Sequence, residues 1–102
     1  MQCTTVLYPN NKGAKFDFDY YTKNHIPMAL KLIGKGIAKT EVRKGLSSQD
    51  GSPPKYICVA SIWIGDPAEY QARFAQHAPE ILADIRNYTN VEPVIQLDEV
   101  LL

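Results

Sequence analysis

Hydrophobic and polar residues follow a β-α-β-β-α-β pattern along the chain, with turn residues between the segments. Four segments are rich in β-branched and aromatic residues or alternate in charge, as strands do, at residues 3–8, 37–46, 56–64 and 91–100. Two others begin with a capping aspartate, Asp17 or Asp66, and are predicted to be helices. We expect Pro27 to kink or split the first helix and Pro79 to break the second, because proline removes a backbone hydrogen bond.

This order of elements, with right-handed crossovers, predicts one ferredoxin-like α+β domain over residues 1–102, a sandwich with an antiparallel sheet in the strand order 4-1-3-2. The distribution of charge supports that order. The second strand carries four charged residues and the fourth contains Pro93, so both suit the edges of the sheet. The first and third strands carry little charge and suit its centre.

The third strand, residues 56–64, is hydrophobic on both of its faces. Cys58 and Ala60 share one face, whereas Ile57, Val59 and Trp63 lie on the other. Two helices can cover only one face of a sheet of this size. We therefore expect a homodimer in which a second copy covers the other face, so that two sheets form a dimeric α/β barrel.

Composition limits the partners that the chain is expected to have. Of its 102 residues, 11 are basic and 11 are acidic, so the formal net charge of zero favours neither nucleic acid nor a membrane surface as a partner. The N-terminus has no signal-peptide pattern, and we expect a cytoplasmic protein. Cys3 and Cys58 are expected to be buried free thiols. No metal-ligand spacing and no glycine-rich nucleotide motif is present, and we expect neither a metal nor a cofactor.

One motif in the first helical segment is more specific than the rest of the pattern. It consists of an aspartate, an aromatic pair, and a histidine two places before a proline: Asp19, Tyr20, Tyr21, His25 and Pro27. A second stretch covers residues 74–77 and 80–90. Together they resemble the EthD family, named for ethyl tert-butyl ether degradation, of the dimeric α/β-barrel superfamily. The chain departs from the family at Arg86, where the family often has proline.

The resemblance implies a homodimer with a pocket between the sheet and its helices or inside the barrel. Relatives in the superfamily include cofactor-free monooxygenases, polyketide cyclases, haem-handling proteins and members with no assigned activity. The family name records an association with ether breakdown and establishes no reaction, because one fold serves many functions.

His25 is the main candidate for a catalytic residue, with Tyr21 beside it. Asp17, Tyr21 and His25 are spaced by four and therefore share one face of a continuous helix. Histidine titrates near neutrality and can move a proton. The alternative is structural: His25 bonds a backbone carbonyl that Pro27 has freed and closes the kink. We expect His77, before the predicted break at Pro79, to satisfy helix-end carbonyls.

Three further residues are candidates for binding a ligand: Tyr20, Asp84 and Trp63. Aromatic side chains with polar tips suit an apolar pocket, although most of them are expected in the core or the dimer interface. The sequence therefore supports two hypotheses, a cofactor-free enzyme of oxygenase or cyclase type acting on a small apolar oxygenated or aromatic molecule, and a non-catalytic ligand-binding or auxiliary protein of a catabolic pathway. A third, haem binding through His25 or His77, has no specific sequence signal.

Overall fold

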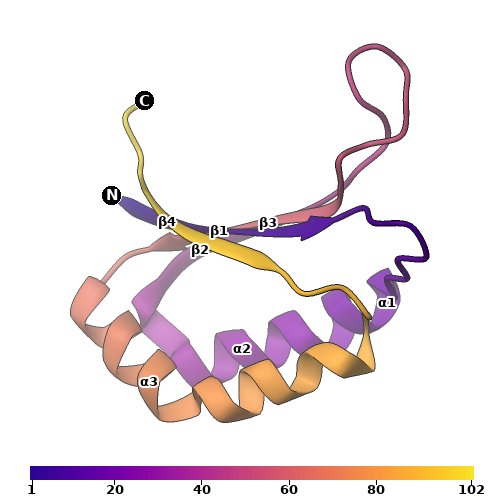
Figure 1. The fold of residues 1–102 in the computed structure, drawn as a ribbon. Helices are drawn as coiled ribbons and strands as arrows, with labels where there is room; N and C mark the ends of the chain where they lie inside the picture. The colour runs from indigo at the N-terminus through magenta and orange to yellow at the C-terminus, as the bar shows by residue number, and fades with distance from the viewer.

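The computed structural model describes all of residues 1–102 and places two helical segments on one face of a four-stranded antiparallel sheet (Figure 1). The strands are β1 (Gln2–Pro9), β2 (Ile37–Lys44), β3 (Tyr56–Ile64) and β4 (Val94–Glu99). The first helical segment consists of α1 (Phe18–Tyr20), a π-helical turn η1 (Tyr21–His25), α2 (Ile26–Ile33) and a 3-10 turn η2 (Gly34–Gly36). The second consists of α3 (Pro67–Ala83) and a 3-10 turn η3 (Asp84–Asn87).

The strand order is β2-β3-β1-β4, which confirms the predicted ferredoxin-like arrangement. The central strands β1 and β3 pair antiparallel, and Val6 of β1 lies between Ala60 of β3 and Ile95 of β4. The charged strand β2 and the strand that follows Pro93 lie at the two edges. β4 is shorter than predicted and begins after Pro93, which has no N–H to give to a neighbouring strand.

Both predicted helix caps are present. The carboxylate of Asp17 accepts a hydrogen bond from the backbone N–H of Tyr20 at 3.0 Å, and Asp66 accepts one from the N–H of Glu69 at 3.2 Å. Each cap satisfies a donor that the first helical turn leaves free. The Asp17 cap fixes the start of the first helical segment shortly before Tyr20 and Tyr21.

The two internal prolines have different effects on their helices. Before Pro27 the helix widens into the π turn η1, in which the N–H of Ile26 bonds the carbonyl of Tyr21, five residues earlier. At Pro79 the predicted break is wrong, because α3 continues through it to Ala83. Pro79 and Ala75, whose carbonyl loses its partner, lie on the exposed side of α3, where water can bond that carbonyl.

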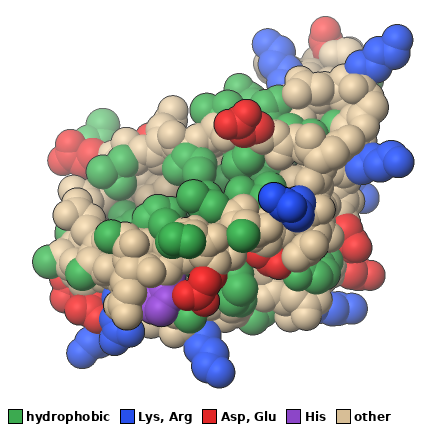
Figure 2. Space-filling view, turned by 60° about the horizontal axis from the view of Figure 1, so that its bottom comes forward, with side chains coloured by type: hydrophobic (Ala, Val, Ile, Leu, Met, Phe, Trp, Pro, Cys, Tyr) green, Lys and Arg blue, Asp and Glu red, His purple; other side chains and the backbone are tan.

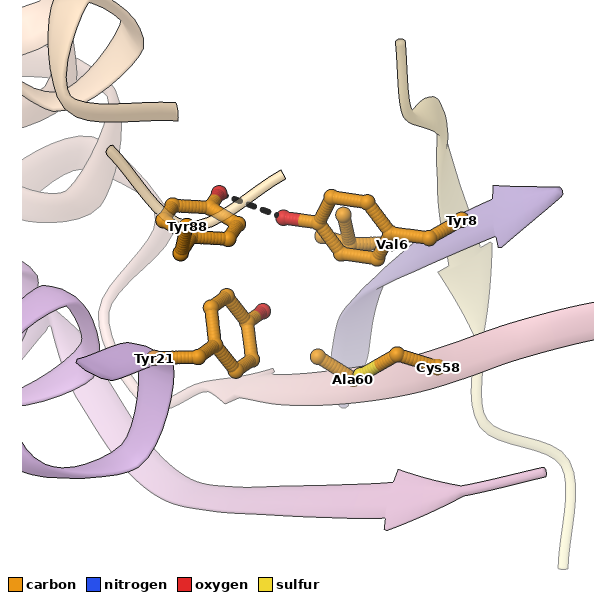
Figure 3. Packing of buried hydrophobic residues seen from close by; sticks show 6 residues of the cluster. All are labelled: Val6, Tyr8, Tyr21, Cys58, Ala60 and Tyr88. Atoms are coloured by element: carbon orange, nitrogen blue, oxygen red, sulfur yellow. Dashed lines mark hydrogen bonds between the residues drawn. The ribbon is translucent and has the colours of Figure 1, made fainter. Parts of the chain in front are cut away.

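The core lies between the sheet and the helices and is unusually rich in tyrosine. Figure 3 shows Tyr21 and Tyr88, from the helical layer, facing Tyr8 and Cys58 on the sheet. The rings of Tyr8 and Tyr21 meet edge to face at 5.7 Å between centroids. Three phenol hydroxyls are thus brought into a largely apolar interior, where each needs a polar partner.

The opposite face of the sheet carries no helix (Figure 1). This face is less apolar than the alternation in β3 predicted. Leu7 and Val59 are half-buried on it. Polar groups lie there too: the Lys39 ammonium is 4.7 Å from the Trp63 ring centre, and Thr5 donates a hydrogen bond to Asp98. The loop between β2 and β3 and the C-terminal end both extend from this side (Figure 1). No helix of the protein has the length and hydrophobicity needed to cross a membrane.

Candidate functional site

The π turn directs His25 toward the end of the second helical segment. His25 is 6% exposed, and its Nδ1 lies 2.9 Å from Oδ2 of Asp84, the first residue of η3. The Tyr21 ring stacks on the imidazole, with 5.4 Å between ring centres and 12° between planes. His25 is therefore held from both helical segments: Tyr21 belongs to the first, and Asp84, which follows His25 by 59 residues in the chain, belongs to the second.

Asp84 accepts hydrogen bonds on both carboxylate oxygens. The Tyr20 hydroxyl donates to Oδ1 at 2.7 Å, and the side-chain amide of Asn87 donates to the same oxygen at 2.9 Å. Partial burial alone raises the pKa of this carboxyl, but the hydrogen bonds from Tyr20, Asn87 and His25 outweigh it and hold the pKa below its ordinary value. Asp84 is therefore a carboxylate at neutral pH.

The Asp84 contact determines which ring nitrogen of His25 carries hydrogen. An ionised carboxylate only accepts hydrogen bonds, so Nδ1 must be the donor. In the neutral imidazole, Nε2 is then a bare acceptor. Its partner within hydrogen-bonding range is the Tyr88 hydroxyl, at the long distance of 3.5 Å. This is the arrangement of a histidine that can take up a proton at Nε2 while the carboxylate stabilises the resulting charge.

Tyr88 connects His25 to the sheet. Its hydroxyl lies 2.8 Å from that of Tyr8, as the dashed line in Figure 3 shows. Burial raises the pKa of both Tyr88 and Tyr8, so both phenols stay protonated at neutral pH. Polar groups therefore run in an unbroken series from Asp84 through His25 and Tyr88 to Tyr8.

His25, Tyr88 and Tyr8 line part of a cavity of about 290 Å³ between the sheet and the helices, and Asp84 lies behind His25, outside the wall. Most of the wall is aliphatic or aromatic, from α2, α3, β1 and β4, and it contains no Lys, Arg, Asp or Glu. Leu82, Ile95 and Leu97 belong to the wall yet are about half exposed, so the cavity opens between α3 and the edge strand β4. Figure 2, turned so that the helix side comes forward, shows hydrophobic side chains gathered across this face and most charged ones toward its rim.

A second, more open hollow of about 680 Å³ lies at the end of β1 and β4. Its wall contains no histidine, cysteine or tyrosine. No group of three or more His, Cys, Asp and Glu side chains is placed to share a metal ion. The smaller cavity, with His25 at one end, is therefore the better candidate for a site.

The structure brings together four of the five residues singled out from the sequence, namely His25, Tyr21, Tyr20 and Asp84. Trp63 is not among them: it lies on the opposite face of the sheet, beneath Lys39. Tyr20 contacts the site through Asp84 and does not line the cavity.

The alternative in which His25 closes the kink through a backbone carbonyl is not what the structure shows, since both ring contacts are to side chains. His77 does not bond helix-end carbonyls either. It lies inside the continuous helix α3 and contacts Glu80 at 3.1 Å. The prediction for His77 failed because it depended on a break at Pro79.

Sequence reasoning missed the roles of Tyr8 and Tyr88. Both look like ordinary core aromatics, and nothing in their spacing connects positions 8, 25 and 88. The one available signal was the need of buried phenol hydroxyls for polar partners, which favours clusters such as this one.

The geometry defines a ferredoxin-like α+β protein with an apolar pocket that ends in a carboxylate–histidine–tyrosine series. The sequence profile of the EthD domain matches residues 13–92, and the chain belongs to the EthD family. An EthD-like protein from Ralstonia eutropha JMP134 shares 36% identity over 99% of this chain and 92% of its own, with a TM-score of 0.92.

More distant structures share the fold. An ethyl tert-butyl ether degradation family protein from Bacillus halodurans C-125 is 18% identical, covers 99% of both chains and has a TM-score of 0.73. SnoaB, a cofactor-independent oxygenase from Streptomyces nogalater, is 12% identical over 97% of this chain and 90% of its own, with a TM-score of 0.54. No curated protein sequence matches the chain significantly.

Proposed function

We propose that this protein is a cofactor-free enzyme in which His25 is the acid/base and a small apolar oxygenated or aromatic molecule is the substrate. The observation that carries the proposal is the 2.9 Å contact between Asp84 and His25 Nδ1, which leaves Nε2 as an acceptor at the end of an apolar cavity. A positioned acid/base of this kind contributes about 10²–10⁴-fold to a rate.

Each neighbour of His25 has a part in this proposal. Asp84 fixes the tautomer and stabilises the imidazolium, Tyr20 and Asn87 fix Asp84, and Tyr21 holds the ring by stacking. The aliphatic walls keep water away from the reacting atoms and strengthen the electrostatic interactions among them.

The reaction that we propose is of oxygenase or cyclase type and begins with removal of a proton from the substrate by His25. The likeness in fold to SnoaB, a cofactor-independent oxygenase, is compatible with this proposal. Because the two sequences are only 12% identical, that likeness supports the fold and not the reaction.

A second candidate is a non-catalytic ligand-binding or auxiliary protein. The observation that favours it is the near absence of polar groups from the cavity wall outside the His25 end. Apolar walls are sufficient for binding without turnover. In this case the Asp84–His25 contact ties the two helical segments together and does no chemistry.

We also propose that two copies associate through the open faces of their sheets. Leu7, Val59 and Trp63 are only half-buried there, and Val94 at the edge of the same face is 52% exposed. The loop between β2 and β3 and the C-terminal end project from that side (Figure 1). In the proposed dimer they would flank the second sheet. An interface of this kind buries on the order of 2,000 Å² in total.

The chain contains two histidines, which allow a matched test of the proposed function. His25→Asn, His77→Asn and the wild type are incubated in air with a panel of small phenols, naphthols and ketones, and consumption is followed by mass spectrometry. We expect His25→Asn to lose turnover by about 10²–10⁴-fold and His77→Asn to keep it. Equal turnover by His25→Asn and the wild type would contradict the enzyme proposal. Binding of a panel compound by the wild type, with turnover by none of the three proteins, would favour the second candidate.

A further inference from the structure

The polar end of the cavity presents one acceptor and one donor side by side. In the neutral imidazole, His25 Nε2 has no hydrogen of its own, because Nδ1 carries it and donates to Asp84. Next to it lies the Tyr88 hydroxyl, 3.5 Å away, which also contacts the Tyr8 hydroxyl at 2.8 Å. Either hydroxyl can donate across the contact between Tyr8 and Tyr88; in the arrangement where Tyr8 donates, the hydrogen of Tyr88 is directed to the His25 side, where 3.5 Å is too long for a strong bond.

We infer that the pocket takes a neutral ligand with a weakly acidic hydroxyl, a phenol or an enol, whose oxygen contacts both Tyr88 and His25 Nε2. The inference rests on the proposed function and deepens it, because it names the reacting group of the ligand and adds Tyr88 as a catalytic residue. The two protein atoms are close enough that one oxygen can lie at about 2.8 Å from each.

The donor and acceptor pattern selects the hydroxyl group. A ligand oxygen at this position must donate to Nε2 and accept from Tyr88. An ether, a ketone or a carboxylate accepts only and leaves Nε2 without a partner, whereas a phenol or an enol does both. An unpaired buried group is costly, so this mismatch discriminates strongly between ligands.

Charge also favours a neutral ligand. The cavity wall contains no Lys or Arg to pair with an anion, and a negative charge, the carboxylate of Asp84, lies behind His25. A carboxylate or phosphate entering the cavity loses its hydration and gains no counter-ion. The apolar mouth at Leu82, Ile95 and Leu97 suits a hydrophobic body attached to the hydroxyl.

The proton transfer that follows is balanced within the site. The O–H bond of the ligand breaks, its proton forms an N–H bond at His25 Nε2, and the electron pair stays on the ligand oxygen. Asp84 stabilises the imidazolium, and Tyr88 donates a hydrogen bond to the new phenolate or enolate. Burial keeps Tyr88 protonated and available as that donor, since it raises the pKa of the phenol.

Three naphthalene probes test the inference by fluorescence titration at neutral pH: 2-naphthol, its methyl ether 2-methoxynaphthalene, and the anion 2-naphthoate. We expect 2-naphthol to bind about tenfold more tightly than the ether, and the anion more weakly than both. Tyr88→Phe removes the donor from which the oxygen of either neutral probe accepts, so it should weaken 2-naphthol and the ether alike, while 2-naphthol keeps its advantage through Nε2. Tyr56→Phe, the same change at a residue outside the cavity wall, should alter neither.

Four results would overturn the inference: equal binding of naphthol and ether by the wild type, tighter binding of naphthoate, an unchanged naphthol affinity in Tyr88→Phe, or no binding of any probe. The comparison of the three probes on the wild type stands even if Tyr88→Phe folds poorly. If any of these results occurs while His25→Asn still lacks turnover, the ligand class is wrong and the proposed function holds. If His25→Asn retains full turnover, the proposed function itself has failed.

Discussion

Replacing Asp84 by Asn changes the hydrogen-bonding role of His25 while keeping the shape of the site. Two of the three donors to Asp84, Tyr20 and Asn87, point at Oδ1, and only His25 points at Oδ2. We therefore expect the amide oxygen of the variant to take the place of Oδ1 and its NH₂ group to face His25. Nδ1 must then accept, so hydrogen moves to Nε2, which can no longer take a proton from a ligand.

The cost in stability follows from the same contacts. All three hydrogen bonds can be kept, but each changes from charge-assisted to neutral because the carboxylate is gone, and the bond with His25 reverses its direction. A hydrogen bond to a charged group contributes about 1.5–3 kcal/mol, and because the Asp84 side chain is 14% exposed we expect a loss near the low end, about 1–2 kcal/mol. Turnover should fall far more, by about 10²–10⁴-fold, since the acceptor nitrogen is lost.

Urea denaturation of the wild type, Asp84→Asn, His25→Asn and the double variant measures the coupling between the two residues. We expect a coupling energy of about 1–2 kcal/mol. Asp19→Asn is the matched control, because the Asp19 side chain is 87% exposed and its contact with Lys23 should contribute little. Additive effects of the two single changes, or full turnover by a folded Asp84→Asn, would refute the reasoning.

Further predictions concern stability, thiols and association. The folded pKa of Asp84 lies below its ordinary value of 3.8, so the contribution of Asp84 to stability is complete above pH 3.8 and is lost as the pH falls through the folded pKa. In urea melts, the difference in unfolding free energy between the wild type and Asp84→Asn should therefore be smaller below about pH 4 than at pH 7. Burial raises the pKa of Cys58 to about 12, so Cys58 and the buried Cys3 should react slowly with thiol reagents until urea is added, and rapid labelling of the native protein would contradict this. Gly36→Ala should cost about 1–3 kcal/mol in a thermal melt, because its Cβ meets the Tyr70 backbone nitrogen at 2.8 Å, and an unchanged melt would contradict that packing. Light scattering should give about twice the 11.4 kDa chain mass, whereas a stable monomer would exclude the proposed dimer.

The fold was predictable because its signals are local. Charge and proline placed the edge strands, and aspartate caps at Asp17 and Asp66 placed the helix starts. The bounds of β3 agree with the sequence pattern, since its run of hydrophobic residues is flanked by turn residues. Pro79 was misjudged because the cost of an internal proline depends on whether the freed carbonyl faces water, which sequence alone does not reveal.

The site was predictable only in part, because its contacts are long-range. His25 and Asp84 were singled out separately, and their pairing depends on how η1 packs against η3. Alternation along β3 predicts that Trp63 and Cys58 lie on different faces of the sheet, but it does not say which of the two faces the helices cover. Tyr8 and Tyr88 resemble any other core aromatics until packing brings their hydroxyls together.

The protonation of the two ring nitrogens of His25 tests the central claim most directly. A ¹⁵N-resolved NMR spectrum of the imidazole at neutral pH, recorded before and after 2-naphthol is added, reports both nitrogens separately. We predict hydrogen on Nδ1, a bare Nε2, and a change in the Nε2 resonance on addition of the ligand while Nδ1 keeps its hydrogen. Hydrogen on Nε2 in the free protein, or an Nε2 resonance that stays unchanged when 2-naphthol is added, would contradict the role proposed for His25.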